Sequence, residues 1–217
     1  MNSLNSHSSK LVQARTFGGV GSILLVLSLV PYFGFVLGII GLILILIAVK
    51  YISEEVNEPT IFNNILYAVI VAIIGIAIST LLGFSIIAAM FTGGGPPISI
   101  FIDGSDIEPE TFWMPGMGGF PFTVMAFFML ILAVLWIILI VSAVFLRRGL
   151  DLIASHLKVG LFSTAGLLYL IGAFLSIILV GFLLVFIASI LMAVAFFSLP
   201  DRVPQESSQT QTPGSGA

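Results

Sequence analysis

The chain has 217 residues, of which 59% are hydrophobic and only 8% are charged, and its mean hydropathy is +1.24. A soluble globular domain carries about 25% charged residues, so a chain this apolar cannot cover a surface that faces water. The formal net charge of −3, without any basic run, gives no indication of nucleic-acid binding. Cysteine is absent, which excludes disulfides, thiolate metal sites and cysteine nucleophiles. The composition therefore predicts a membrane protein with several helices in the bilayer.

The first long charge-free stretch covers residues 16–49. As one helix it would be about 51 Å long, whereas the hydrocarbon core of a bilayer is roughly 30 Å thick. Pro31 removes a helix hydrogen bond and Gly34 tolerates turn geometry, so we expect the chain to fold back there. The expected helices cover about 16–30 and 34–52. They form either two full spans or a re-entrant hairpin, and both versions return the chain to the same side.

Two further apolar stretches follow, and charged connectors bound them. Residues 50–60 form the first connector, in which Pro59 suits the first turn of a new helix. Residues 147–158 combine apolar residues at helical spacing with charged ones, which predicts an amphipathic helix that continues the fourth span. A break around residues 176–181 divides the last apolar stretch, which is too long for one span. The four helices predicted in this part of the chain are about 61–90, 121–146, 160–175 and 180–198.

The predicted fold is all-α, a polytopic helical membrane protein. Its six transmembrane helices are arranged as a hairpin, a long helix pair and a second hairpin. Residues 1–15 are expected to form a cytoplasmic N-terminal tail and residues 16–199 a six-helix membrane domain. Residues 92–121 form an extracytoplasmic loop within that domain. Residues 200–217 are rich in Pro, Gly and Ser, and they predict a disordered cytoplasmic tail.

The distribution of basic residues predicts the orientation. All seven Lys and Arg residues lie in the N-terminal tail, the two short connectors and the C-terminal tail, and loop 92–121 contains none. Alternation of six spans places those four segments on one side of the membrane and the loop on the other. Because basic segments stay on the cytoplasmic side, we expect a multi-pass protein of the cell membrane with both termini in the cytoplasm.

Loop 92–121 contains four carboxylates beside several aromatic residues. Carboxylate oxygens suit a hard cation such as Ca²⁺, but their spacing lacks the glycine and terminal glutamate of an EF-hand loop. We interpret the loop as a solvated acidic segment, and ion binding or contact with a partner outside the cell remains an alternative. Its carboxylates are Asp103, Asp106, Glu108 and Glu110.

Small residues recur at helical spacing in several predicted spans. Such stripes let helix backbones approach closely in a bilayer, where no hydrophobic effect drives association. We interpret them as contacts within the chain, with a homo-oligomer or a larger membrane complex as the alternative. The stripes are Gly34, Gly38 and Gly41; Ala68, Ala72, Gly75, Ser79 and Gly83; and Gly172 with Ser176.

The interiors of the predicted spans contain no Asp, Glu, Lys, Arg or His and few polar side chains. Proton relays and ion-coupled carriers place ionisable groups at membrane depth, so this pattern argues against those classes. The polar residues near mid-depth are expected to bond helices to one another or to their own backbone, and a constriction for a small neutral solute is the alternative. They are Ser79, Thr80, Trp136, Tyr169 and Ser189.

The charged residues of the predicted cytoplasmic segments do not have the spacing of a metal site or a hydrolytic site. Nothing in their spacing pairs the acidic residues with the histidine, and no Ser/His/Asp order, P-loop or HExxH motif is present. We expect these groups to be surface charges with local Lys and Arg partners. They are Glu54, Glu55, Glu58, Asp151 and His156.

Three segments carry a family resemblance: GGVGSILLVLS at 18–28, ISEEVNEPTIFNN at 52–64 and GFLLVFIASILMAVAFFSLP at 181–200. In these segments the chain resembles an archaeal family of integral membrane proteins classified as a domain of unknown function. The likeness covers most of residues 15–200. It implies an archaeal cell-membrane protein, and it assigns no activity, cofactor or catalytic residue.

The sequence therefore predicts a non-enzymatic integral membrane protein that acts through packing or partner binding. The alternative is a channel or permease for a small uncharged solute. We expect no catalytic, cofactor-binding or metal-binding residue, and we expect the lipid bilayer as the surrounding partner.

Overall fold

The computed structural model describes residues 3–28, 32–92, 122–178 and 180–204. Within these ranges the structure is all-α, as expected, with six α-helices and one short 3₁₀ helix. Each α-helix contains a stretch long and apolar enough to cross a membrane. The elements are α1 (Ser3–Leu27), α2 (Gly34–Glu55), α3 (Pro59–Thr92), α4 (Phe122–Leu157), α5 (Gly160–Leu175), η3 (Ser176–Ile178) and α6 (Val180–Phe197).

Most helix boundaries agree with the sequence predictions. Pro59 is the first residue of α3, where its missing N–H costs nothing. α4 continues without a break through the predicted amphipathic segment, and α5 and α6 begin where expected. The two short connectors each contain a left-handed residue, Asn57 with φ 54° and Lys158 with φ 56°, which lets the chain reverse within a few residues. The predicted turn at Pro31, loop 92–121 beyond Thr92 and the C-terminal tail beyond Pro204 lie outside the described residues.

The start of the first helix differs from the prediction. α1 begins at Ser3 and not near residue 16, so much of the expected polar tail is helical. Leu11 and Ala14 are buried, and Lys10 forms an ion pair with Glu54 at 3.0 Å. These residues form an amphipathic extension of the span. The prediction was wrong because it treated polar composition as a tail and overlooked this apolar face.

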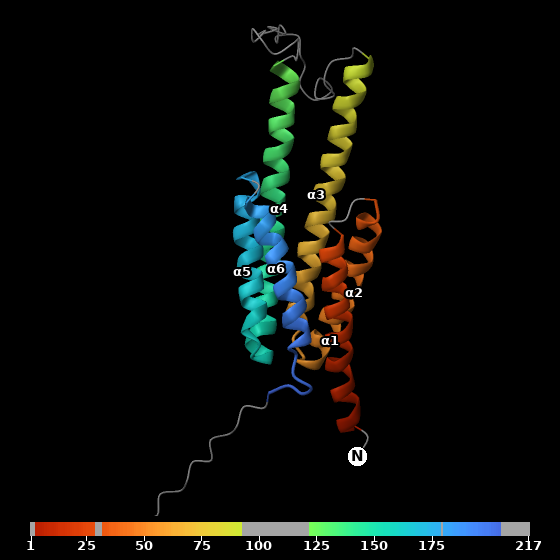
Figure 1. The fold of residues 1–217 in the computed structure, drawn as a ribbon, viewed down its shortest axis with the longest axis vertical. Coiled ribbons are helices and arrows are strands. Elements are labelled where there is room, and N and C mark those ends of the chain that lie inside the picture. The colour runs from red at the N-terminus through yellow and green to blue at the C-terminus, as the bar shows by residue number, and fades with distance from the viewer. Residues whose placement is uncertain (1–2, 29–31, 93–121, 179, 205–217) are drawn as a thin grey trace, which may run out of the picture.

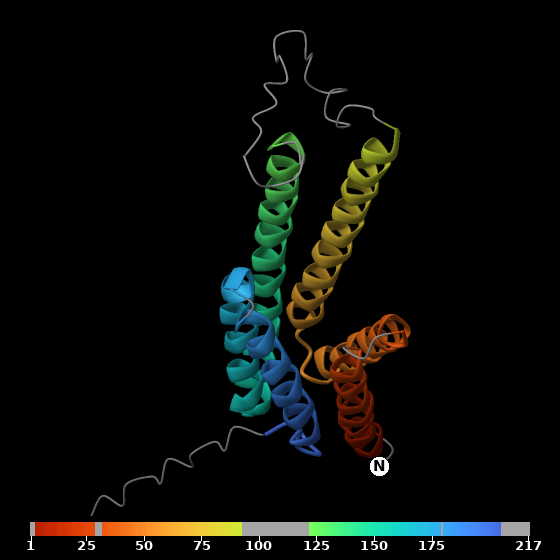
Figure 2. The same ribbon diagram turned by 45° about the horizontal axis from the view of Figure 1, so that its top comes forward.

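The six helices form a closed ring. Each helix packs against the next one along the chain, and α6 returns to pack against α1 (Figure 1). α2 and α3 make the least extensive of these contacts, and they diverge from their common connector (Figure 2). The two chain ends therefore belong to neighbouring helices.

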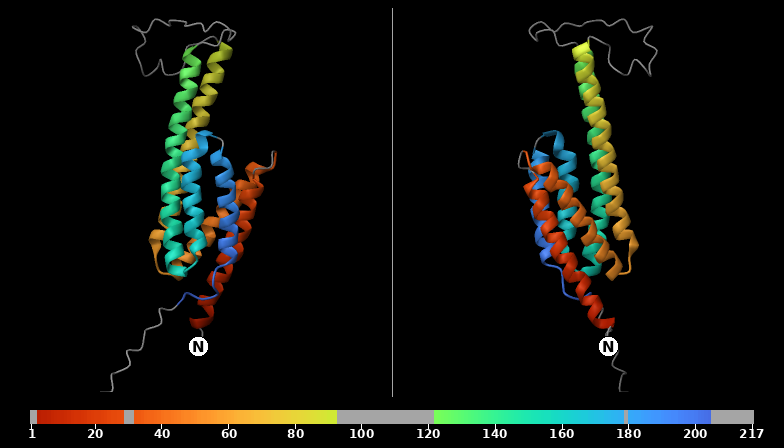
Figure 3. Two further views of the ribbon diagram at one scale, coloured as in Figure 1. Left: turned by 60° about the vertical axis from the view of Figure 1, so that its left-hand side comes forward. Right: turned by 90° about the vertical axis from the view of Figure 1, so that its right-hand side faces the viewer.

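The helices differ greatly in length. α3 has 34 residues and α4 has 36, whereas α5 has 16 and α6 has 18. At 1.5 Å per residue the long pair measures about 51–54 Å and the α5–α6 pair about 24–27 Å. Both views of Figure 3 show α3 and α4 extending well beyond the turns of the α1–α2 and α5–α6 hairpins. The predicted arrangement of hairpin, long pair and hairpin is therefore observed.

The tightest packing lies at the end of the bundle that carries the termini and the two short connectors, which we call the charged end. Phe162 and Phe196 are fully buried there, and their rings meet edge to face at 5.1 Å. Ile52 and Ile61 from either side of the α2–α3 connector are buried in the same cluster, as is Leu157 at the end of α4. The opposite part of the bundle exposes large apolar side chains, as expected where lipid is the solvent.

Candidate functional site

Two of the five polar residues predicted near mid-depth meet directly. The Tyr169 hydroxyl on α5 and the Ser189 hydroxyl on α6 are 2.6 Å apart. Ser189 also donates to the carbonyl oxygen of Val185 at 2.9 Å, so in the pair Tyr169 is the donor and Ser189 the acceptor. This bond holds the second hairpin together, as the helix-bonding interpretation predicts.

Trp136 and the α3 residues do not join this pair. The Trp136 indole N–H donates to the backbone carbonyls of Ala173 at 3.1 Å and Phe174 at 3.3 Å on α5, and its ring packs edge to face on Phe174. Thr80 bonds back to Ile76 of its own helix. The Ser79 hydroxyl on α3 is buried and has no hydrogen-bond partner among the described residues. The five predicted residues therefore do not form one connected polar layer.

The α3–α4 seam contains a polar contact that the sequence analysis missed. The Ser142 hydroxyl on α4 donates to the carbonyl oxygen of Ala68 on α3 at 2.8 Å. The sequence contains a signal for this contact, because Ser142 is the only hydroxyl residue in the last part of the predicted fourth span. A β-carbon on Gly75 would strike Ile138 across this seam, which explains why the small residue is needed there.

The glycine stripes serve contacts within the chain. A β-carbon on Gly21 would lie 2.7 Å from the carbonyl oxygen of Gly41, and one on Gly41 would lie 2.7 Å from that of Gly21. Gly172 has the same relation to Gly181 across the second hairpin, at 3.0 Å. Gly83 near the far end of α3 differs, because a β-carbon there would meet nothing within 4 Å. In both hairpins these glycines therefore lie at contacts between helices of the same chain.

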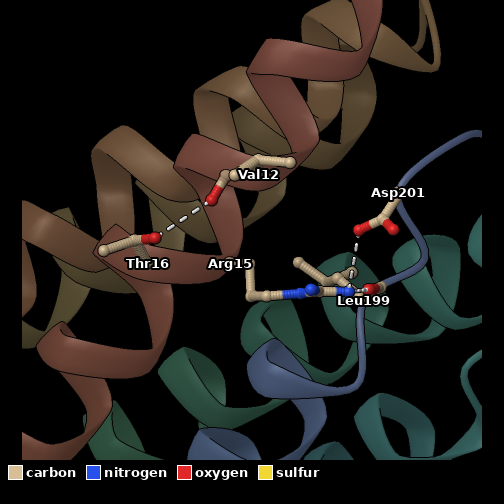
Figure 4. A network of polar contacts seen from close by, with 5 residues as sticks. All are labelled: Val12, Arg15, Thr16, Leu199 and Asp201. Atoms are coloured by element: carbon tan, nitrogen blue, oxygen red, sulfur yellow. Dashed lines mark hydrogen bonds and ion pairs between the residues drawn. The ribbon is translucent and has the colours of Figure 1, made fainter.

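At the charged end, one arginine joins the two ends of the chain. Arg15 on α1 donates a hydrogen bond to the carbonyl oxygen of Leu199 and forms an ion pair with Asp201 at 3.2 Å, as Figure 4 shows. Leu199 is buried, so the contact fixes the chain just after α6 against α1. The side chain of Arg15 is partly exposed, and that of Asp201 is exposed.

The acidic residues of the charged end do not converge on a site. Glu54 pairs with Lys10, as described above. Asp151 lies 3.5 Å from Arg147 one turn away and accepts a hydrogen bond from the Ser163 hydroxyl at 2.6 Å. Among the described residues, no group of three His, Asp or Glu side chains could hold a metal ion.

Glu58 and His156 lie close enough to interact, but each has a local role. Hydrogen bonds from the Thr60 side chain and backbone N–H hold the pKa of Glu58 below its ordinary value, and His156 lowers this pKa slightly further. The His156 ring nitrogen Nδ1 lies 2.9 Å from the carbonyl oxygen of Leu152 in its own helix. Glu58 therefore caps the start of α3. The four carboxylates of loop 92–121 lie outside the described residues, so ion binding there stays a prediction.

These contacts define a class of protein: an all-helical, multi-pass membrane protein whose polar side chains join helices to one another. The profile of a protein family of unknown function, DUF996, matches residues 37–190, and the chain belongs to that family. The chain is also 30% identical over 200 residues to an uncharacterised protein, MJ1644, of the archaeon Methanocaldococcus jannaschii. That alignment covers 91% of this chain and 98% of the relative. No solved structure matches the chain significantly. The resemblance to an archaeal family of unknown function is confirmed.

Proposed function

We propose that this protein is a non-enzymatic structural or partner-binding component of the cell membrane, with both termini in the cytoplasm. The observation that carries the proposal is the use of its polar side chains within the described helices. Tyr169, Trp136 and Ser142 each bond a neighbouring helix. These side chains stabilise the bundle, and their hydrogen-bonding groups are already engaged, which supports a packing role over a chemical one.

The proposed orientation rests on charge. Lys10, Arg15 and Arg147 form ion pairs with residues of the charged end, and Lys158 lies in the connector between α4 and α5. Loop 92–121, which connects α3 to α4 in the sequence, contains no basic residue. The positive-inside rule therefore supports a cytoplasmic charged end. Fusion of a reporter enzyme that is active only in the cytoplasm to each terminus tests this, and activity at both termini is expected.

A contact with a second copy or with a membrane partner is proposed on the face of α3 around Gly83. Open space lies beside this glycine, while Leu81 and Phe84 next to it are about 70% exposed. Beside Gly21, Gly41 and Gly172 in the hairpins, by contrast, the space is occupied by other parts of the chain. Because the protein has no cysteine, a Gly83→Cys variant provides a single crosslinking position in the native membrane.

Purification of the native protein in mild detergent, followed by identification of co-purifying chains, tests the partner-binding role. We expect a stoichiometric partner or a defined oligomer that crosslinks through Gly83→Cys. Flux of a small neutral solute into liposomes that contain the pure protein, absent from a Tyr169→Ala variant of equal stability, would instead support the permease. A protein that purifies as a monomer without flux would contradict both functions.

A further inference from the structure

The apolar part of α1 is shorter than a bilayer. Arg15 lies at the level of Leu199 and Asp201, where the chain leaves the bundle, so this level is in contact with water. Above Arg15, α1 has only the 12 residues from Thr16 to Leu27. They measure about 18 Å, against roughly 30 Å for the hydrocarbon core. α1 can be counted as a span only when Lys10 and Arg15 are included in it.

In the second hairpin, α5 has the same limitation. Asp151 of α4 bonds Ser163 in the first turn of α5, and the backbone of Arg147 packs beside Gly166. Residues 167–178 above that level, including the 3₁₀ turn, reach only about 20 Å. From the same Arg147 level, α4 runs through 25 uncharged residues, 122–146, which measure about 38 Å. Above the Arg147 level, α4 is therefore long enough to cross the hydrocarbon core, whereas α5 is not.

The turns of both short hairpins are apolar and exposed. Tyr32 is 98% exposed and Phe35 is 81% exposed beside the first turn. Ile177 and Ile178 form most of the second turn, and each is nearly 70% exposed. The two short connectors at the charged end differ from these turns, because both connectors contain charged residues. Exposed aromatic and aliphatic turns without any charge fit the acyl chains of lipids.

The backbone of the second turn is also suited to lipid. Non-helical backbone within the hydrocarbon core must satisfy its polar groups internally. The 3₁₀ helix η3 continues α5 almost to the start of α6, and Ser176 bonds back to the carbonyl oxygen of Ala173. Glycine at position 181 allows the start of α6 to approach α5 this closely. A β-carbon there would overlap the carbonyl of Gly172 and the backbone around Ser176.

We propose that only α3 and α4 cross the bilayer completely, and that the α1–α2 and α5–α6 hairpins are re-entrant. Both hairpins enter and leave at the charged end, and their turns lie among lipid acyl chains inside the hydrocarbon core. Figure 3 shows the two turns well short of the far ends of α3 and α4. The basic residues do not distinguish two crossings from six, because each hairpin returns to its own side. The proposal holds whichever side the charged end faces, so it stands or falls independently of the proposed function.

Single cysteines test the proposal, since the protein has none. We choose Tyr32→Cys and Ile177→Cys at the two turns, Thr92→Cys at the far end of α3, and Ser155→Cys near the charged end of α4. A charged, membrane-impermeant maleimide is applied separately to right-side-out and inverted membrane vesicles. We expect Thr92→Cys and Ser155→Cys to react from opposite sides. Both turn cysteines should react at least about tenfold more slowly from either side, because the hydrocarbon core excludes a charged reagent.

A depth measurement distinguishes lipid burial from burial in protein. A nitroxide spin label at each cysteine is compared for collisions with oxygen, which concentrates in lipid, and with a water-soluble nickel complex. We expect oxygen to dominate at the two turns and nickel at Thr92→Cys and Ser155→Cys. Equal melting temperatures of all four variants serve as the folding control. Reaction of either turn cysteine from the Thr92 side at the rate of Thr92→Cys would overturn the proposal for that hairpin, as would a nickel-dominated signal there.

Discussion

The contact between Gly18 and Phe196 gives the most direct test of how the ring is closed. A β-carbon on Gly18 of α1 would overlap the ring of Phe196 on α6. Phe196 is fully buried and is held edge to face by Phe162, so its ring cannot move aside cheaply. Overpacking of this kind costs about 1–3 kcal/mol, whereas alanine for glycine in a helix otherwise gains up to about 1 kcal/mol. We therefore expect Gly18→Ala to be less stable, by about 1–3 kcal/mol in the free energy of unfolding, than the same substitution at a helix position with open space.

Gly83→Ala is the matched control, because it is the same substitution in a helix but has open space beside it. Unfolding of both variants in mixed micelles with increasing sodium dodecyl sulfate, followed by circular dichroism, provides the comparison. Gly83→Ala should equal or exceed the wild type in stability. In the double variant Gly18→Ala/Phe196→Ala the overlap is gone, so its loss should be smaller than the sum of the two single losses. Equal stability of Gly18→Ala and Gly83→Ala, or strictly additive losses, would refute the packing argument.

Three further contacts give simpler predictions. Tyr169→Phe removes the hydroxyl that bonds Ser189, so it should lower the free energy of unfolding by about 1 kcal/mol in the same assay. A loss near zero would show that this hydrogen bond does not stabilise the fold. Arg15→Gln should release the C-terminal segment, measured as faster amide hydrogen exchange after α6, and unchanged exchange would contradict its role as a clamp. Hydrogen bonds hold the folded pKa of Glu58 below its ordinary value of 4.5. The contribution of ionised Glu58 to stability is therefore complete above pH 4.5 and is lost as the pH falls through the folded pKa. Thr60→Ala should flatten this acid-side loss of stability, and an unaltered pH profile would exclude the Glu58 contact as its cause.

The sequence predicted the polar residues better than their arrangement. Tyr169 and Ser189 were assigned to adjacent helices at similar depth, and they do meet. Trp136 was assigned to the same layer but bonds carbonyls of α5, because which face of a helix a side chain occupies depends on the rotation of that helix in the bundle. Ser142 was missed for the same reason. Residue types and spacing show that a polar group needs a partner, while packing decides which partner it finds.

Composition alone indicated an all-helical membrane protein, and the charge pattern predicted that the termini and the short connectors share one side. Those inferences depend on the cost of placing charge and unpaired backbone in lipid, which any arrangement of the chain must obey. The sequence left open whether the first hairpin crosses the membrane, because composition gives the length of an apolar stretch but not its height. Only the tertiary structure places Arg15 beside Leu199 and Asp201, and this contact fixes where water begins on α1. It also shows that α3 and α4 extend beyond both short hairpins, a difference in depth that only the packing of the helices decides.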